Sequence, residues 1–184
     1  MKSIPTRPWS VTTDSVAEFT PVWLLDVDGV LNAGRPGWGG PPVRLGVPAD
    51  GVVYPLTWAP ALMARIGRIH SSGSVEIRWA TTWVDQIAGV QAAMGLPSFP
   101  VAFRHPRPGR GAAEAKEAAA LRVVEVEGRS LIWTDDAAIP SDGPVRERLA
   151  ASGRPQLLIA PDPRRGLQPT DLDEIAAFLA MHRH

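Results

Sequence analysis

The stretch VWLLDVDGVLN, residues 22–32, combines an apolar run with two aspartates and a glycine. Its first four residues form an unbroken apolar run, which is typical of a strand buried on both faces of a parallel sheet. Asp26 and Asp28 follow the run, and Gly29 then allows the backbone to turn. Open parallel sheets bind their ligands beyond the carboxyl ends of the strands. We therefore expect these two carboxylates to lie at a functional site.

Strands and helices alternate along the rest of the chain. The pattern predicts further strands at residues 75–80, 101–103, 131–134 and 157–160, and helices at 60–69, 84–94, 112–121, 145–151 and 170–181. Such alternation implies right-handed crossovers, and therefore a parallel sheet with helices on both faces. We expect residues 1–184 to form one α/β domain, a Rossmannoid three-layer sandwich. Residues 1–20 are read as a flexible or surface arm, and Thr170 as the start of the last helix.

A segment rich in glycine and proline separates the first strand from the second. Its first part, AGRPGWGGPP, is unsuited to a helix or a central strand. VRLGV and VVYPLTW then surround a Pro-Ala-Asp-Gly turn, which predicts a hairpin. We expect residues 33–58 to form a small flap, with no large cap domain. Trp38 and Trp58 of this flap either pin the loop to the core or stack on a base, a contact worth roughly 1 to 3 kcal/mol.

The composition excludes several classes of function. The 184 residues include 19 basic and 19 acidic side chains, which argues against binding of nucleic acid or an anionic membrane by bulk electrostatics, so we expect any phosphate binding to be local. The absence of cysteine excludes disulfides, thiolate zinc sites, iron–sulfur clusters and cysteine nucleophiles. No stretch approaches the roughly 18 apolar residues of a membrane span, and no secretory signal pattern opens the chain. We expect a cytoplasmic protein with no membrane contact and no obligate protein partner.

Polar side chains also follow two later strands. Thr81 and Thr82 come after the second expected strand, and Asp135 and Asp136 come after the strand at 131–134. Together with the first two aspartates and a lysine, they suit phosphoryl transfer through a covalent aspartyl phosphate. A carboxylate attacks phosphorus only if the phosphoryl charge is masked, and Mg²⁺ on oxygen ligands provides that masking.

The residues of this set have distinct expected roles. Asp26 is the expected nucleophile, and Asp28 the general acid that later acts as base for water. Thr81 is expected to donate its hydroxyl to the phosphoryl oxygens, with Thr82 as the alternative. Lys116 is expected to neutralise the nucleophile and the transferring group. The expected Mg²⁺ ligands are Asp26, the backbone carbonyl of Asp28, and one or both of Asp135 and Asp136.

Each of these groups also has a purely structural interpretation. Asp26 and Asp28 can form an Asx turn after a strand, and the two threonines can simply end one. Asp135 and Asp136 can cap the next helix. Lys116 can be a solvated helix residue paired with a nearby glutamate. Only two of the 19 basic residues are lysines, however, and this rarity favours a functional role for the lysine in mid-chain.

Four motifs resemble those of a known superfamily. DVDGVLN at 26–32 resembles the first motif of the haloacid dehalogenase superfamily of aspartate-nucleophile phosphohydrolases. WATTW at 79–83, Lys116, and WTDD at 133–136 resemble its second, third and fourth motifs, in the expected order. WATTW, WTDD and IAPDPRRGLQPTDLDEI at 159–175 more narrowly resemble the haloacid dehalogenase domain of the Swiss Army Knife RNA repair proteins. That group is itself similar to the phosphatase half of polynucleotide kinase-phosphatases.

The resemblance covers about residues 22–180 and implies a Mg²⁺-dependent phosphomonoesterase. It suggests RNA or DNA phosphate ends as the substrate class, and a site without a large cap suits a large substrate. Thr82, Arg107 and Arg110 are expected to contact that substrate, although the loop RHPRPGR can also be an ordinary solvated loop. Arg164 and Arg165 are a further candidate pair. The alternatives are a small-metabolite phosphatase or phosphotransferase on the same site, and a non-catalytic phosphate-binding module.

Overall fold

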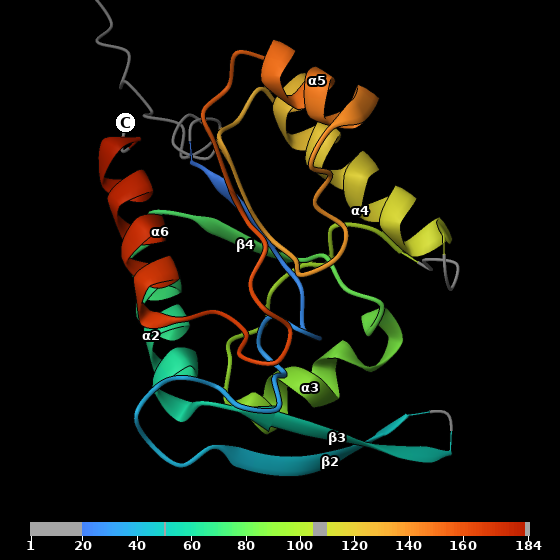
Figure 1. Cartoon of the computed structure of the whole chain (residues 1–184), viewed down its shortest axis with the longest axis vertical. Coiled ribbons are helices and arrows are strands. Elements are labelled where there is room, and N and C mark those ends of the chain that lie inside the picture. The colour runs from blue at the N-terminus through green and yellow to red at the C-terminus, as the bar shows by residue number, and fades with distance from the viewer. Residues whose placement is uncertain (1–19, 50, 105–109, 183–184) are drawn as a thin grey trace, which may run out of the picture.

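A sheet of parallel strands forms the centre of the molecule (Figure 1). The computed structural model describes residues 20–49, 51–104 and 110–182. The four strands lie in the order β4-β1-β5-β6, so β1 has a parallel neighbour on each side. Their bounds are Val22–Leu25 for β1, Glu76–Trp79 for β4, Leu131–Thr134 for β5 and Gln156–Ile159 for β6. The expected arm, residues 1–20, lies outside the described residues apart from Thr20.

Helices cover both faces of this sheet (Figure 1). The helices α2 and α6 pack on one face, and α4 and α5 on the other. Successive residues of β1 alternate between the two cores: Trp23 and Leu25 join α2 and α6, whereas Val22 and Leu24 join α4 and α5. The predicted mixed α/β fold with helices on both faces is thus confirmed. These helices span Pro60–Ser71 (α2), Arg110–Leu121 (α4), Gly143–Ala151 (α5) and Pro169–Met181 (α6).

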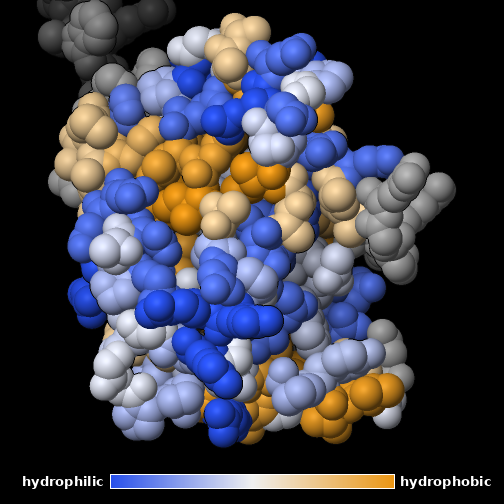
Figure 2. Space-filling view, viewed as in Figure 1, coloured by the Kyte–Doolittle hydropathy of each residue, from blue (hydrophilic) through white to orange (hydrophobic). Residues whose placement is uncertain are grey.

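A hairpin of β2 (Val43–Ala49) and β3 (Val52–Trp58) follows the first strand, as predicted. Its inner face is apolar and packs on α3 (Ile87–Met94), which a short helix, η1 (Val84–Gln86), precedes. Near the turn its large side chains stay exposed, and Figure 2 shows apolar side chains gathered at the surface there. The described residues between β1 and β4 form only this hairpin, α2 and their connecting loops.

The two tryptophans of this segment serve packing. Trp58 is buried in the core beneath the hairpin. Trp38 packs against the same core, and its indole Nε1 donates a hydrogen bond of 2.7 Å to the carbonyl of Leu167. The interpretation that they pin the loop to the core is therefore confirmed, and stacking on a base has no support. Trp23 and Trp133, within strands, are fully buried.

The structure differs from the sequence predictions at residues 101–103 and at the bounds of several elements. Residues 101–103 form no strand, because the chain makes a single bridge, from Val101 to Trp79. Pro100 lacks the N–H that would extend the ladder. The last helix begins at Pro169 and not at Thr170, since Gln168 is its N-cap and forms a capping box with Asp171. No helix in the described part of the chain has the length and apolarity needed to cross a bilayer.

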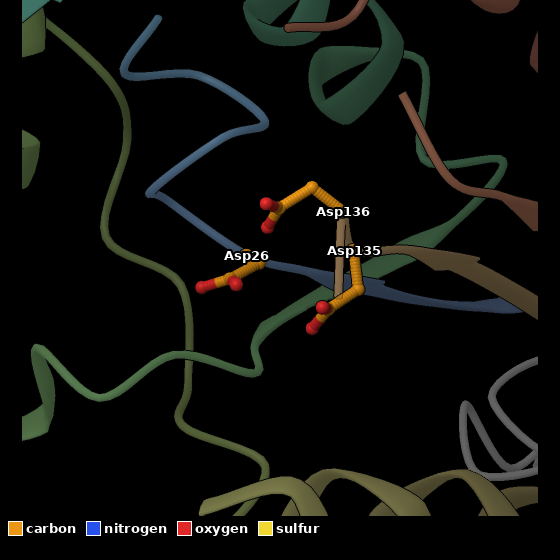
Figure 3. A group of neighbouring side chains, drawn as sticks. All are labelled: Asp26, Asp135 and Asp136. Carbon is orange, nitrogen blue, oxygen red and sulfur yellow. The ribbon is translucent and has the colours of Figure 1, made fainter. Parts of the chain in front are cut away.

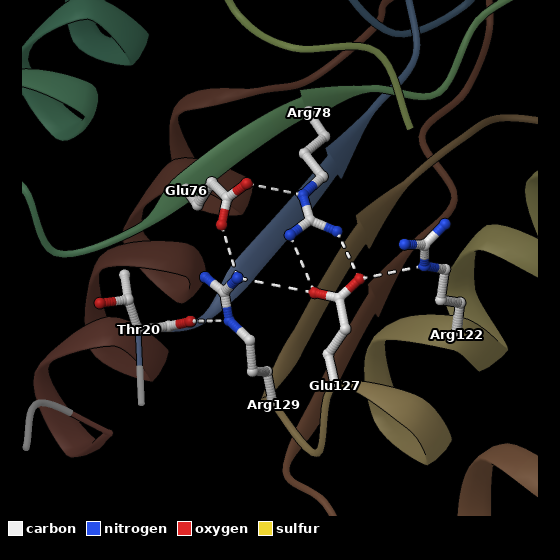
Figure 4. Close-up of polar contacts among 6 residues, drawn as sticks. All are labelled: Thr20, Glu76, Arg78, Arg122, Glu127 and Arg129. Atoms are coloured by element: carbon white, nitrogen blue, oxygen red, sulfur yellow. Dashed lines mark hydrogen bonds and ion pairs between the residues drawn. The ribbon is translucent and has the colours of Figure 1, made fainter. Parts of the chain in front are cut away.

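A network of charged side chains joins the amino ends of three strands (Figure 4). Glu127 accepts two parallel hydrogen bonds of 2.8 Å from the guanidinium of Arg78. Arg129 donates to the carbonyl of Thr20 at 2.6 Å and to Glu76 at 2.5 Å. Burial raises the pKa of Glu76, but its hydrogen bonds and ion pairs with the two arginines outweigh burial and leave the pKa below its usual value. This network links the strands at their amino ends, which lie opposite the carboxyl ends that carry the candidate site.

Candidate active site

Three aspartates gather at the carboxyl edge of the sheet (Figure 3). Asp26 follows the central strand β1, and Asp135 and Asp136 follow its neighbour β5. Each offers a carboxylate oxygen, and these oxygens all lie within 4.8 Å of one another. Asp26 and Asp135 are buried, at 5% and 0% exposed, whereas Asp136 is half-buried. The structure therefore brings together the three aspartate side chains that the sequence assigned to a metal.

The sheet ladder fixes the backbone beneath this cluster. Leu25 is level with Trp79 of β4 and Thr134 of β5, so the three strands end together. Backbone hydrogen bonds then continue one residue further: Asp26 N donates to the carbonyl of Thr134 at 3.2 Å, and Asp135 N to that of Ile159 at 3.2 Å. The carboxylates thus stand on the rigid end of the sheet and not on a loose loop.

Lys116 reaches the cluster from α4. Its Nζ lies 2.5 Å from Oδ2 of Asp26 and 2.7 Å from Oδ2 of Asp135. The side chain is only 9% exposed. The alternative that Lys116 is a solvated helix residue is therefore wrong. The lysine that stood out by composition is the one that bridges the first and fourth motifs.

Among the described residues, Lys116 is the cation that pairs with this cluster of three carboxylates, and it pairs with Asp26 and Asp135. Burial raises the pKa of Asp26 to about 7, against the opposing charge of Lys116 and with a further rise from Asp135. Burial and the charge of Asp135 also raise the pKa of Asp136. Burial lowers the pKa of Lys116, but attraction to the two buried aspartates outweighs burial and raises it.

This charge imbalance suits a hard divalent cation. Oδ2 of Asp135 is fully buried, and its described partner is the ammonium of Lys116, which it shares with Asp26. Buried carboxylates that keep their charge need a compensating partner. Mg²⁺ prefers carboxylate and carbonyl oxygens. The residues present therefore fit the cofactor that the sequence suggested.

Local turns orient the two aspartates after β5. Oδ1 of Asp135 accepts hydrogen bonds from the backbone N–H groups of Ala137 and Ala138, at 3.0 and 2.7 Å. It therefore shapes its own turn, and it does not cap α5, which begins only at Gly143. Gly29 has a φ of +69°, and a Cβ at this position would collide with the carboxyl group of Asp136. Gly29 thus allows the turn after β1 and also leaves room for the carboxylate of Asp136, a candidate ligand of the metal.

Asp28 stands beside the cluster and not within it. Its side chain is exposed, and its charge makes a small contribution to the raised pKa of Asp136. Oδ1 accepts a hydrogen bond of 2.7 Å from Nδ2 of Asn32, and Oδ2 one of 2.7 Å from Nε1 of Trp83. Sequence reasoning did not single out these two partners, although both lie inside the quoted motifs. Asn32 lies four residues after Asp28 in the first motif, so local spacing could have suggested that pair, whereas nothing in the local sequence joins Trp83 to Asp28.

The two threonines after β4 have different surroundings. Thr81 is fully buried, and its Oγ1 accepts a hydrogen bond of 3.4 Å from the backbone N–H of Trp83. Thr82 is exposed. Of the two, Thr81 is therefore the residue held inside the fold, whereas Thr82 lies at the surface.

The expected arginine contacts are only partly visible. Arg107 lies outside the described residues, and of Arg110 only the backbone at the start of α4 is described. Arg164 and Arg165 are exposed in the loop after β6, where Arg165 donates to Gln168 at 3.2 Å. No contact among the described residues joins this pair to the aspartates, so their role in substrate binding stays a prediction.

The site combines a buried carboxylate, a lysine paired with it, a buried hydroxyl and an exposed carboxylate nearby. A comparison with models of protein families found no match, and searches among curated proteins and solved structures found none either. The functional interpretation therefore rests on the geometry of this site and on the four motifs that converge there.

Proposed function

We propose that this chain is a Mg²⁺-dependent phosphomonoesterase of the haloacid dehalogenase type, which acts through an aspartyl phosphate on Asp26. The observation that carries the proposal is the bridge of Lys116 between Asp26 and Asp135, inside a cluster of three carboxylates. A buried nucleophile, a charge-neutralising lysine and a set of oxygen ligands are what phosphoryl transfer to a carboxylate requires. The order of the four motifs adds independent support.

Three side chains and one backbone group are proposed to hold the cofactor. Asp26, Asp135 and Asp136 offer the carboxylate oxygens that lie within 4.8 Å of one another. The backbone carbonyl of Asp28 is the proposed additional ligand. When bound, Mg²⁺ masks the negative charge of the phosphoryl group, so that a carboxylate can approach the phosphorus.

The first half of the proposed reaction transfers the phosphoryl group to Asp26. A carboxylate oxygen of Asp26 attacks the phosphorus, and the bond between phosphorus and the leaving oxygen breaks. Asp28 gives its proton to that oxygen, which departs as an alcohol. Lys116 balances the charge on Asp26 as it changes, and the hydroxyl of Thr81 donates a hydrogen bond to a phosphoryl oxygen.

The second half restores the enzyme. Asp28, now a carboxylate, takes a proton from a water molecule whose oxygen attacks the phosphorus of the aspartyl phosphate. The bond between phosphorus and Asp26 breaks, inorganic phosphate leaves, and Asp28 is protonated again. One phosphomonoester and one water are consumed, and one alcohol and one phosphate are formed.

The proposed substrate class is a phosphorylated RNA or DNA end, as in nucleic acid repair. Support comes from the motif resemblance and from the lack of a large cap over the described site. A panel of phosphorylated oligonucleotides, nucleotides and sugar phosphates tests it, because a preference for sugar phosphates would assign a small-metabolite phosphatase instead.

Release of phosphate from an aryl phosphate tests the activity itself. We expect turnover with Mg²⁺, no turnover in a chelator, and none for Asp26→Asn. Asp142→Asn is the matched control, because Asp142 is exposed, precedes α5 and makes no capping hydrogen bond. If the wild-type chain hydrolyses neither aryl phosphates nor phosphorylated oligonucleotides, the proposal is overturned.

A further inference from the structure

We infer that Trp83 is a positioning residue, which holds the Asp28 carboxyl through its indole N–H and links it to the hairpin through Tyr54. The inference rests on the proposed function, because that function gives Asp28 its part in proton transfer. Asp28, the proposed acid, and Asp26, the proposed nucleophile, are held in place by different neighbours.

The contact between Trp83 and Asp28 joins a buried group to an exposed one. The indole Nε1 donates a hydrogen bond of 2.7 Å to Oδ2 of Asp28. Trp83 is only 9% exposed and belongs to the main core cluster, so packing fixes its ring. Asp28 is exposed and has no packing of its own to select one rotamer. The indole N–H therefore supplies one of the two hydrogen bonds that orient this exposed carboxylate.

The second oxygen of the same carboxylate is tied to the hairpin strand β3. Nδ2 of Asn32 donates a hydrogen bond of 2.7 Å to Oδ1 of Asp28. Oδ1 of Asn32 accepts a hydrogen bond of 2.8 Å from the backbone N–H of Thr57. The backbone N–H of Ala33 also donates to the carbonyl of Thr57, at 2.9 Å. Both oxygens of Asp28 are thus held by neutral donors, and one of those donors is anchored on the hairpin.

Tyr54 connects Trp83 to the exposed half of the hairpin. The two rings meet edge to face, with centroids 5.5 Å apart and planes at 85°. Tyr54 lies on the same face of β3 as the buried Leu56 and Trp58, yet it stays 42% exposed. Tyr54 thus connects the exposed half of the hairpin to the ring that holds Asp28.

Asp26, in contrast, makes no described contact with the hairpin. Its two oxygens are held by Lys116 and by the backbone N–H of Val27, at 2.5 and 2.7 Å. Disturbing Trp83 should consequently impair protonation of the leaving group more than attack by Asp26. This difference can be measured, because alkoxide leaving groups need a proton far more than phenolates of low pKa.

The test compares kcat/KM for an alkyl phosphate and an aryl phosphate, since kcat/KM reports only the steps up to departure of the leaving group. Trp83→Phe keeps a ring beside Tyr54 but removes the donor. We expect its kcat/KM to fall tenfold to a hundredfold more for the alkyl than for the aryl substrate. Trp38→Phe is the matched control, because it also removes an indole hydrogen bond of 2.7 Å, one that goes to Leu167. We expect Trp38→Phe to leave the ratio of the two substrates unchanged.

A spectroscopic measurement reads the contact without turnover. The indole N–H resonance of Trp83 is identified by its loss in Trp83→Phe, and Asp28→Ala should shift it. An unshifted resonance would overturn the inference. An equal loss of kcat/KM on both substrates, or a loss no larger than in Trp38→Phe, would also overturn it while the proposed function stands. A wild-type chain with no phosphatase activity would overturn both.

Discussion

Exchange of Asp136 for asparagine separates the charge of the aspartate cluster from its shape. The carboxylate oxygens lie within 4.8 Å of one another, and at an effective dielectric constant of about 20 two unit charges at that distance repel by about 3.5 kcal/mol. Lys116 makes ion pairs with Asp26 and Asp135. The carboxylate of Asp136 is thus the one that the lysine balances least. In a chelator, we expect Asp136→Asn to be at least as stable as the wild-type chain.

With Mg²⁺ added, the wild-type chain should become more stable than Asp136→Asn. A ligand that binds only the folded state contributes about 2.7 kcal/mol at a concentration of a hundred times its Kd. For a domain of this size, 1 kcal/mol corresponds to about 2 to 4 °C in Tm, so the wild-type Tm should rise by about 5 to 11 °C. Asp136→Asn loses a charged ligand oxygen and should show a much smaller rise at the same Mg²⁺ concentration.

Thermal unfolding followed by circular dichroism measures both effects. Each variant is melted in chelator and across a series of Mg²⁺ concentrations, with Asp142→Asn as the control that loses an aspartate outside the cluster. A wild-type Tm that Mg²⁺ does not raise would contradict a metal site at this cluster. The same rise in Asp136→Asn as in the wild-type chain would contradict the role of Asp136, because its carboxylate would then play no part in the site.

Further predictions concern the frame around the site. Gly29→Ala should cost about 1 kcal/mol or more in the free energy of unfolding and reduce Mg²⁺ stabilisation, as denaturant unfolding with and without Mg²⁺ would show. Glu127→Gln should lower the free energy of unfolding by about 1 to 3 kcal/mol, because it breaks the largely buried bidentate pair with Arg78. Glu125→Gln breaks an exposed pair with Arg148 and should lower the free energy of unfolding less. Equal losses in urea unfolding would contradict this prediction. Glu76 has a lowered pKa, so its stabilising contribution is present above its usual value of 4.5 and is lost as the pH falls below it. Glu76→Gln should therefore flatten the acid side of the plot of stability against pH.

Much of the fold could be predicted because its strands are unambiguous. Val22–Leu25 and Leu131–Thr134 are buried on both faces, and they read as apolar runs that end at Asp26 and at Thr134. The failure at 101–103 has a different origin. A bridge of one residue beside Pro100 depends on tertiary contact with Trp79, which no local pattern encodes.

The candidate site could be predicted in its members but not in its contacts. The order β4-β1-β5 places Asp26 between the loops that carry Thr81 and Asp135, and this follows from topology. The pairing of Trp83 with Asp28 does not follow from topology, because it joins residues 55 apart in the sequence through a large aromatic side chain whose type alone suggests only burial. Local spacing reveals which residues follow a strand, whereas the partners of a side chain depend on packing.

Detection of a covalent intermediate is the direct test of Asp26 as the nucleophile. The wild-type chain is mixed with an aryl phosphate and Mg²⁺, quenched in acid within its turnover time, digested, and mapped by mass spectrometry. We predict a phosphoryl group on the peptide that contains Asp26, absent when Mg²⁺ is chelated and absent in Asp26→Asn. Turnover with no phosphorylated peptide in wild-type or Asp28→Asn protein, where hydrolysis of the intermediate should be slow, would contradict a nucleophilic role for Asp26.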